Sequence, residues 1–475
     1  IPLDVWKKLI KSTYDDININ PLYTRADELD EVAAPGVFPF IRGSYVSDAS
    51  RAGWGVTETF GTHGTAADVN KLILHALNNG TTNVVLDLTG DLSADDLSTV
   101  LGDVYLDLVP LRLHAGTDTA AAATALYALI DATVELGATP LTSRVDGSDT
   151  TSLDDAIALA VDASARPGDV RAIMIDGVAL SNQGATDAQE VGMALAAGVD
   201  YLRALTAAGL TPEQALKQLS FRFAATDEQF EEIAKFRAAR GLWARIAEVV
   251  GAPEAGSAPQ HAITAPVMFS QRDPWVNMLR CTVAAFGGGV GGASDVEVLP
   301  FDYVVPGGMP GTSRTFASRI ARNTNLLLLE ESHLGFVVDP AGGSFFVEDL
   351  TDKLADKAWA VFTEIESHGG FTAAVESGAI ATALDASHER TRADIARRAK
   401  KLTEFPNLGE QPLSDDRRAE PRGIRRWAAE FEALRNRSDV YLTAKGTRPQ
   451  AVLIPLGPLA KHNIRTGFAT NLLAS

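Results

Sequence analysis

The sequence predicts an α/β fold built around a (β/α)8 barrel. From about residue 70, short aliphatic runs alternate with stretches of helical periodicity, which is typical of βα units around a parallel sheet. The runs recur over about 230 residues, a span that suits an eight-stranded barrel. The candidate strands are Val84–Leu88, Leu108–Leu113, Pro140–Val145, Ala172–Ile175, Leu219–Ala224, Pro266–Ser270 and Val296–Phe301.

The helices between these runs are predicted from capping and stop residues at their ends. Thr226–Gln229 has the spacing of a capping box, apolar residues from Phe236 to Val250 recur at steps of three and four, and Gly251 follows as a stop. The same reasoning predicts helices at Asp187–Gly198, Pro274–Phe286 and Thr351–His368.

The two ends of the chain predict further parts. Residues 1–69 are rich in proline and glycine and predict an extended arm before a barrel at 70–345. Residues 346–447 become dense in alternating charge and predict a helical linker region with a solvated surface. Within residues 448–475, Ala451–Gly457 is typical of a first strand and His462–Ser475 of a first helix, so a new α/β domain starts there. Because one strand and one helix bury no core, we expect the natural chain to continue.

Composition excludes several classes of function. The 61 acidic and 42 basic residues give a net charge of -19, which argues against nucleic acid or an anionic membrane as a partner. No apolar run approaches the ~20 residues of a membrane span, and no signal peptide pattern is present. The single cysteine, Cys281, favours a cytoplasmic setting and reads as a core residue rather than a nucleophile.

Polar residues at the predicted strand ends are the candidates for chemistry, because barrel enzymes place their active sites there. Three of them are acids that suit a metal or acid–base site. Arginine and aspartate at strand ends more often pair structurally, and the eight histidines show no metal-ligand spacing, so the structural interpretation is favoured. A metal-assisted barrel enzyme built on the three acids stays open. The candidates are Asp87, Arg112, His114, Arg144, Asp146, Asp176 and Arg222.

Two other patterns have simpler interpretations. Phe286–Gly292 contains GxGxxG, but it follows a helix and precedes a strand, so it predicts a tight turn rather than a dinucleotide site. The aromatic residues of the arm suit a ligand anchor, although packing against a partner is favoured. They are Phe38, Phe40, Tyr45 and Trp54.

Several phrases together resemble one family, the adenosylcobalamin-dependent methylmalonyl-CoA mutases. The resemblance covers nearly the whole chain, and its longest phrase is specific. It implies a (β/α)8 barrel threaded by the coenzyme A tail, a linker, and a flavodoxin-like C-terminal domain that carries cobalamin. The matching phrases are Phe38–Gly43, Gly184–Thr186, Gly198–Ala204, Phe236–Arg240, Arg319–Thr324, Leu328–Ser332 and Val338–Glu348.

Departures from the family pattern concern catalysis and the cofactor. Gly177–Ala179 stands where catalytic chains carry Tyr-His, and Ala49 stands where they carry a substrate-facing tyrosine. In the segment similar to the cobalt-binding DxHxxG motif, placing His462 at the ligand leaves Ala460 at the aspartate and Arg465 at the glycine. The other register places Lys461 at the histidine. The resemblance therefore implies no catalytic, cofactor-binding or metal-binding residue in this chain.

A third departure concerns the barrel interior. Catalytic chains of the family line it with Ser and Thr, whereas this sequence has Val84–Leu86, Leu111–Leu113 and Ile173–Ile175 at the corresponding strands. We expect these aliphatic side chains to fill the bore and exclude a pantetheine chain.

Taken with its departures, the resemblance implies a non-catalytic small subunit. Its partner is then a catalytic large subunit that binds adenosylcobalamin and interconverts methylmalonyl-CoA and succinyl-CoA, with this chain in a structural role. An active acyl-CoA mutase that uses substitute residues stays open as the alternative.

Overall fold

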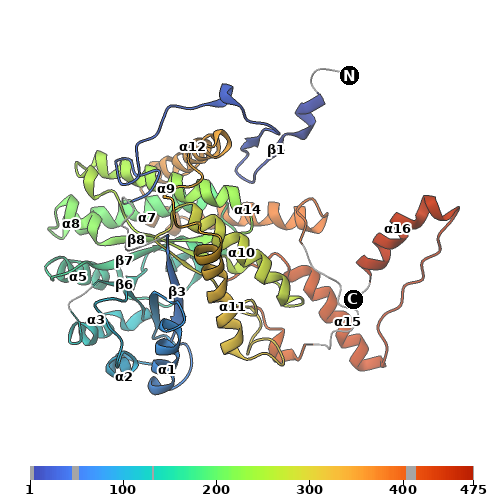
Figure 1. Ribbon diagram of the computed structural model, residues 1–475, viewed down its shortest axis with the longest axis horizontal. Coiled ribbons are helices and arrows are strands. Elements are labelled where there is room, and N and C mark those ends of the chain that lie inside the picture. Colours follow the sequence, from blue (N-terminus) through green and yellow to red (C-terminus); the bar gives the residue numbers. More distant parts are fainter. Residues whose placement is uncertain (1–4, 45–52, 131–132, 403–412, 474–475) are drawn as a thin grey trace.

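Eight parallel strands close into a barrel in the order β10-β3-β4-β5-β6-β7-β8-β9 (Figure 1). This computed structural model describes residues 5–44, 53–130, 133–402 and 413–473. The closed sheet confirms the predicted (β/α)8 fold. The barrel strands are β3 (Gly55–Phe60), β4 (Asn83–Asp87), β5 (Leu111–His114), β6 (Val134–Ala138), β7 (Val170–Asp176), β8 (Leu219–Ala225), β9 (Gln260–Thr264) and β10 (Asp295–Glu297); β1 (Lys11–Ser12) and β2 (Asn18–Ile19) pair in the arm.

Helices surround the barrel, and α12 packs outside α7 and α9 as a second layer (Figure 1). The helices are α1 (Ala66–Leu77), α2 (Leu97–Val100), α3 (Thr119–Tyr127), α4 (Ser143–Asp146), α5 (Leu153–Ser164), α6 (Gly177–Asn182), α7 (Asp187–Ala207), α8 (Pro212–Lys217), α9 (Gln229–Val249), α10 (Pro274–Val290), α11 (Arg314–Leu326), α12 (Phe345–Ser367), α13 (Phe371–Glu376), α14 (Ala379–Ala396), α15 (Ala429–Lys445) and α16 (Leu459–Leu472).

Three strands lie elsewhere than the sequence predicts. Strand β3 falls within residues 1–69, the predicted arm, so the barrel begins before residue 70. The predicted strands at Pro140–Val145 and Pro266–Ser270 are wrong: the first region contains α4 and the second a 3₁₀ turn. The true strands, β6 and β9, lie just upstream. Both strands carry inward-facing polar residues, which interrupt the aliphatic runs that predict strands in the sequence.

Two helix ends also differ from expectation. Thr226 does not cap α9, because its backbone N–H and its hydroxyl both donate to Glu232. At the other end of α9, the predicted stop at Gly251 is confirmed by its φ of +85°. The glycine run predicted as a tight turn instead completes α10. A Cβ on Gly289 would lie 2.5 Å from the ring of Trp54, so these glycines permit close helix packing.

The hydrophobic core lies between the strands and the surrounding helices. Residues at alternate positions of most barrel strands point outward into one continuous buried cluster. The outward-facing strand residues of this cluster include Val84, Leu86, Leu111, Leu113, Ile173 and Ile175.

Helix α15 is attached to the loop that follows β9. The carboxylate of Glu432 accepts hydrogen bonds from the backbone N–H groups of Gln271 (2.6 Å) and Arg272 (3.0 Å), and Arg272 also pairs with Asp439. Glu432 and Asp439 are almost completely buried. This part of the predicted linker is therefore docked on the barrel rather than solvated.

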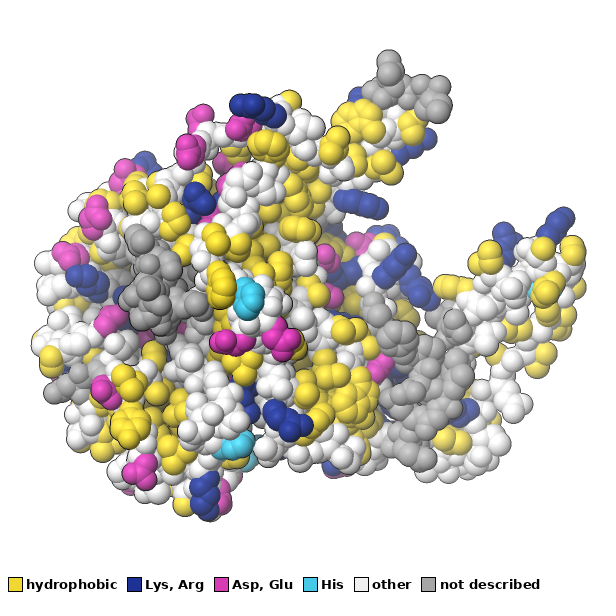
Figure 2. All heavy atoms as spheres, in the orientation of Figure 1, with side chains coloured by type: hydrophobic (Ala, Val, Ile, Leu, Met, Phe, Trp, Pro, Cys, Tyr) yellow, Lys and Arg dark blue, Asp and Glu magenta, His cyan; other side chains and the backbone are white. Residues whose placement is uncertain are grey.

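The C-terminal segment stands away from the barrel (Figures 1 and 2). The predicted helix is present as α16, beginning at Leu459, but no strand is assigned within Ala451–Gly457, since no described residues pair with it. Leu459 and Ile464 of α16 are 68% and 86% exposed. Among the described helices, none has the length and apolar character needed to cross a membrane.

Candidate functional site

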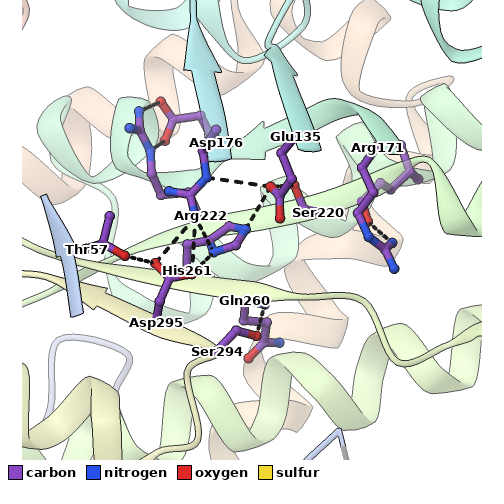
Figure 3. A network of polar contacts seen from close by, with 12 residues as sticks. Thr57, Glu135, Arg171, Asp176, Ser220, Arg222, Gln260, His261, Ser294 and Asp295 are labelled. Atoms are coloured by element: carbon purple, nitrogen blue, oxygen red, sulfur yellow. Dashed lines mark hydrogen bonds and ion pairs between the residues drawn. The ribbon is translucent and has the colours of Figure 1, made fainter. Parts of the chain in front are cut away.

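The interior of the barrel holds a network of buried charges, here called the bore network: Arg112 (β5), Glu135 (β6), His261 (β9) and Asp295 (β10) (Figure 3). Their side chains are at most 15% exposed. His261 lies at the centre, with Nδ1 2.6 Å from Asp295 Oδ2 and Nε2 2.9 Å from Glu135 Oε2. Nδ1 also lies 2.5 Å from Arg112 Nη2, so the two carboxylates favour a positive charge on the ring while the guanidinium opposes it.

Arg112 and two hydroxyl groups complete the network. The Arg112 guanidinium donates to Asp295 at 3.2 Å and lies 3.6 Å from Glu135. Thr57 donates to Asp295 at 2.7 Å and Ser220 donates to Glu135 at 2.8 Å. Two cations thus face two anions whose remaining acceptor sites are filled by hydroxyl groups, the arrangement that buried ion pairs require.

The pKa values follow from this charge balance. Burial acts to raise the pKa of Glu135, but His261, Arg112 and Ser220 outweigh it and lower the value to about 2. Burial likewise opposes ionisation of Asp295, yet His261 and Arg112 hold its pKa well below the usual range. The pKa of His261 is raised, since the two carboxylates outweigh burial and the charge of Arg112. The two carboxyl groups are therefore ionised at neutral pH, and the raised pKa of His261 favours its charged form.

This network corrects the predicted content of the bore. The aliphatic residues expected to fill it, such as Val84 and Leu86, face outward into the core, and alternation leaves Val85, Arg112 and Met174 on the inner face. The interior is filled with side chains, as expected, but mainly with charged ones. The expectation of an aliphatic plug is wrong because strand alternation sends adjacent residues to opposite faces.

At the carboxyl ends of the strands, four of the predicted residues lie together. Arg222 pairs with Asp176 through two hydrogen bonds of 3.0 and 2.5 Å, and the Asp87 carboxylate accepts from the backbone N–H and hydroxyl of Thr89. His114 is adjacent to this group: burial lowers its pKa, Arg222 adds to the effect, and the nearby acids oppose it. Within this rim, Arg222 and Asp176 pair with each other, and Asp87 is held by Thr89.

The remaining predicted candidates are separate from this rim. Arg112 belongs to the bore network, Arg144 pairs at 3.7 Å with the exposed Glu376, and Asp146 accepts from Ser148. Across residues 5–44, 53–130, 133–402 and 413–473, no group of three or more His, Cys, Asp or Glu side chains is placed to hold a metal ion. The metal-assisted alternative thus lacks a site among these residues.

Several residues of the site were missed from the sequence: Glu135, His261 and Asp295, together with Ser220. Glu135 and Ser220 each lie between two apolar residues of their strand, whereas His261 and Asp295 each have one polar and one apolar neighbour. Period-two alternation was the signal that would have found them.

Comparison with known proteins resolves the class of the molecule. The family model for methylmalonyl-CoA mutase matches residues 12–106 and 142–418. The chain is 49% identical over 478 residues to the probable methylmalonyl-CoA mutase small subunit of Mycobacterium tuberculosis, covering 98% of this chain and 77% of that protein. This chain belongs to the methylmalonyl-CoA mutase family.

Two further relatives carry the same description. The methylmalonyl-CoA mutase small subunit of Streptomyces virginiae is 45% identical over 475 residues, covering 96% of this chain and 76% of the relative. The small subunit of Propionibacterium freudenreichii subsp. shermanii is 36% identical over 485 residues, covering 98% of this chain and 74% of the relative.

The longest phrase of the mutase family has a structural role in this chain. Asp339, from Val338–Glu348, accepts from Arg42 at 2.9 Å and also pairs with the fully buried Arg237, which contacts Glu348 at 2.6 Å. These contacts join the arm, α9 and the start of α12. The match to the family therefore reflects shared architecture.

Helix α6 begins where catalytic mutases are expected to place Tyr-His, directly after β7. The Asp176 carboxylate accepts a hydrogen bond from the Val178 N–H at 3.1 Å, which fixes this turn. Val178 and Ala179 are buried and present only aliphatic side chains. Tyr45 and Ala49 lie outside the described residues.

The C-terminal helix does not fit a cobalt ligand of the kind expected in the mutase family. His462 Nδ1 lies 3.2 Å from the hydroxyl of Thr466, and no carboxylate bonded to the ring is described. Ala460 carries no group that orients an imidazole. These residues therefore do not support cobalamin binding through His462.

The other residues singled out from the sequence are packing residues. Trp54 donates from Nε1 to Asn325 at 2.9 Å, and the rings of Phe38 and Phe40 meet edge to face at 6.1 Å. Cys281 is buried in α10, where burial raises the pKa of its thiol to about 12. The prediction that Cys281 is a core residue is confirmed.

Proposed function

We propose that this chain is the small, non-catalytic subunit of a heterodimeric, adenosylcobalamin-dependent methylmalonyl-CoA mutase. The assembled enzyme interconverts methylmalonyl-CoA and succinyl-CoA at an active site carried by the large subunit. The observation that carries this proposal is the bore network, which occupies the space that a coenzyme A tail requires in a catalytic chain.

The bore network opposes threading of a substrate for an energetic reason. A pantetheine chain entering the barrel displaces side chains that satisfy one another, and separating a buried ion pair leaves charges without compensation, at a cost of about 3–5 kcal/mol. The loop after β7 adds to this argument, since Val178 and Ala179 provide no proton donor near a thioester.

In this proposal the cofactor is held by the large subunit. Adenosylcobalamin supplies the radical chemistry when bound, and the surrounding protein supplies binding and shielding. The small subunit contributes a large contact surface, which stabilises the folded large subunit by mass action. The names of the relatives as small subunits support this division of roles.

The test is to purify the full natural chain alone and together with its cognate large subunit. We expect a stable complex with mutase activity, and neither turnover nor retained cobalamin with the small chain alone. His462→Ala in the small chain should leave the cobalamin content of the complex unchanged. Turnover by the isolated small chain would instead support an active mutase that uses substitute residues.

A further inference from the structure

The N-terminal arm is fastened to the body through Asp15. Its carboxylate accepts hydrogen bonds from the Thr186 hydroxyl and, at 3.2 Å, from the Ala188 N–H in the first turn of α7. The position suits a carboxylate because the first N–H groups of a helix lack partners within the helix.

Residues beside Asp15 hold the same stretch of arm from other sides. The Tyr14 hydroxyl donates to Asp394 at 3.3 Å, and Arg390 of α14 donates to the Tyr14 carbonyl and to Asp16. Ile17 is buried in a small cluster with residues of α9 and α12. The segment Thr13–Ile17 therefore bridges α7, α9, α12 and α14.

Beneath Asp15 lies a group of acids that share one lysine. The ammonium of Lys235 is 2.8 Å from Asp187, 3.0 Å from Glu190 and 2.7 Å from Glu232, and all four side chains are at most 15% exposed. Glu231 precedes Glu232 on α9, and the negative charges of Asp187 and Asp15 act on its carboxyl group. We call these residues the clasp cluster: Asp15, Asp187, Glu190, Glu231, Glu232 and Lys235.

A cavity of about 80 Å³ separates this cluster from the C-terminal helices. Charges on its walls are largely paired: Lys400 lies 3.1 Å from Glu228 and over the ring of Trp427, and Arg425 pairs with Asp385. Because Lys400 and Arg425 already have acidic partners, they do not compensate the excess of carboxyl groups over cations in the clasp cluster. The titratable groups facing Asp15 from the cavity and neighbouring elements are Tyr14, Asp187, Glu228, Glu231, Lys235, His388, Lys400 and Arg425.

The pKa values reflect five carboxyl groups around one ammonium. Burial, followed by Asp187, raises the pKa of Asp15 to about 6. Burial is also the main cause that raises the pKa of Glu190 to about 7, of Glu232 to about 8 and of Glu231 to about 9. Docking of the arm is therefore linked to the uptake of protons.

We propose that Thr13–Ile17 is a proton-linked clasp, which holds the arm more tightly against α7 and α9 when the clasp cluster retains protons. The sign follows from Asp15. Its carboxyl group binds a proton more strongly when docked than when free, so the docked state is favoured in acid and loses this advantage as pH rises from about 4 through 6. Glu231, whose raised pKa depends in part on the charge of Asp15, extends the loss above pH 6.

Amide hydrogen exchange of residues 13–19 in the full natural chain tests the clasp. After correction for intrinsic exchange, we expect the protection of these amides to fall about tenfold between pH 5 and pH 8, from a shift of the Asp15 carboxyl between 3.8 and 6. Asp15→Asn should remove most of this dependence, because the amide can still accept from Ala188 but does not ionise.

The matched control is Asp16→Asn, which changes the neighbouring carboxylate of the same arm. Asp16 is 67% exposed and pairs with Arg390 at 2.8 Å. This variant should keep the tenfold dependence. Protection that does not change with pH in the unmodified chain, or an equal pH slope in Asp15→Asn, overturns the proposal. Neither measurement depends on mutase activity.

Discussion

The bore network and the clasp cluster bury charge in opposite ways. In the bore network, Arg112 and His261 face Glu135 and Asp295, and the pKa values of both carboxyl groups are lowered. The clasp cluster sets five carboxyl groups against one cation: three of them contact Lys235, and four of the five have raised pKa values. Burial acts to raise the pKa of Glu135 and Asp295 in the bore network and of Asp15, Glu190, Glu231 and Glu232 in the clasp cluster. The local ratio of cations to anions decides the final direction.

The two regions therefore respond to pH with opposite signs. A carboxyl group with a lowered pKa stabilises the fold above its unfolded value and loses that contribution as pH falls, whereas a raised pKa favours the fold in acid. Four predictions use this contrast.

Removing the cation of the bore network should cause the largest loss. Arg112→Met leaves Glu135 and Asp295 with His261 as their remaining cation, so the free energy of unfolding should fall by about 3–5 kcal/mol, the usual cost of breaking a buried pair. Urea denaturation at pH 7 measures it. A loss below about 1 kcal/mol would mean that the network is not the compensated ion cluster described.

Lys235→Met should cost about 3 kcal/mol at pH 8, since three buried carboxylates lose their shared cation. The loss should shrink toward pH 5, where the clasp cluster takes up protons instead. Thermal unfolding at the two pH values separates these cases. Lys353→Met, at a more exposed pair with Asp349, serves as a control and should show little change at either pH.

Acid should weaken the bore network in a defined range. The Glu135 pKa of about 2 lies below its ordinary value of 4.5, so its stabilising contribution is present above about pH 4.5 and is lost as pH falls toward 2. Glu135→Gln should reduce the slope of unfolding free energy against pH in this window by up to ~1.4 kcal/mol per pH unit. Denaturation curves from pH 5 to pH 2.5 provide the comparison, and parallel slopes would contradict the assignment.

The smallest effect is expected outside both regions. Arg144→Met breaks only an exposed pair at 3.7 Å, so the change in unfolding free energy should stay within about 0.5 kcal/mol. The same urea assay measures it. A larger loss would indicate that the pair between Arg144 and Glu376 contributes more than its exposed geometry implies.

The sequence predicted the barrel better than its interior. Aliphatic runs such as Val84–Leu88 located strands because outward-facing residues must pack against helices, and this pattern is visible along the chain. The content of the bore depends on which face each residue occupies, and a shift of one residue exchanges the two faces. The sequence identifies Arg112 as polar, but the expected bore contains its neighbours Leu111 and Leu113, which point outward and away from it.

Strands β6 and β9 show the same limit. Because Glu135 and His261 interrupt the aliphatic runs of their strands, the two predicted strands lie downstream of the true ones. Of the two carboxylate partners of His261, Asp295 comes from the neighbouring strand β10, whereas Glu135 lies 126 residues away and is brought within hydrogen-bonding distance by the closed sheet. Asp15 was not identified because its neighbours lie more than 170 residues away.

The attachment of α15 through Glu432 has a mechanical consequence. Gln271 and Arg272, which donate to this carboxylate, follow shortly after the strand that carries His261. A force applied to α15 is transmitted through these short, buried bonds to the end of β9, and from there to the centre of the barrel. Displacement of the C-terminal helices and strain on the ion pairs inside the sheet are thus physically connected.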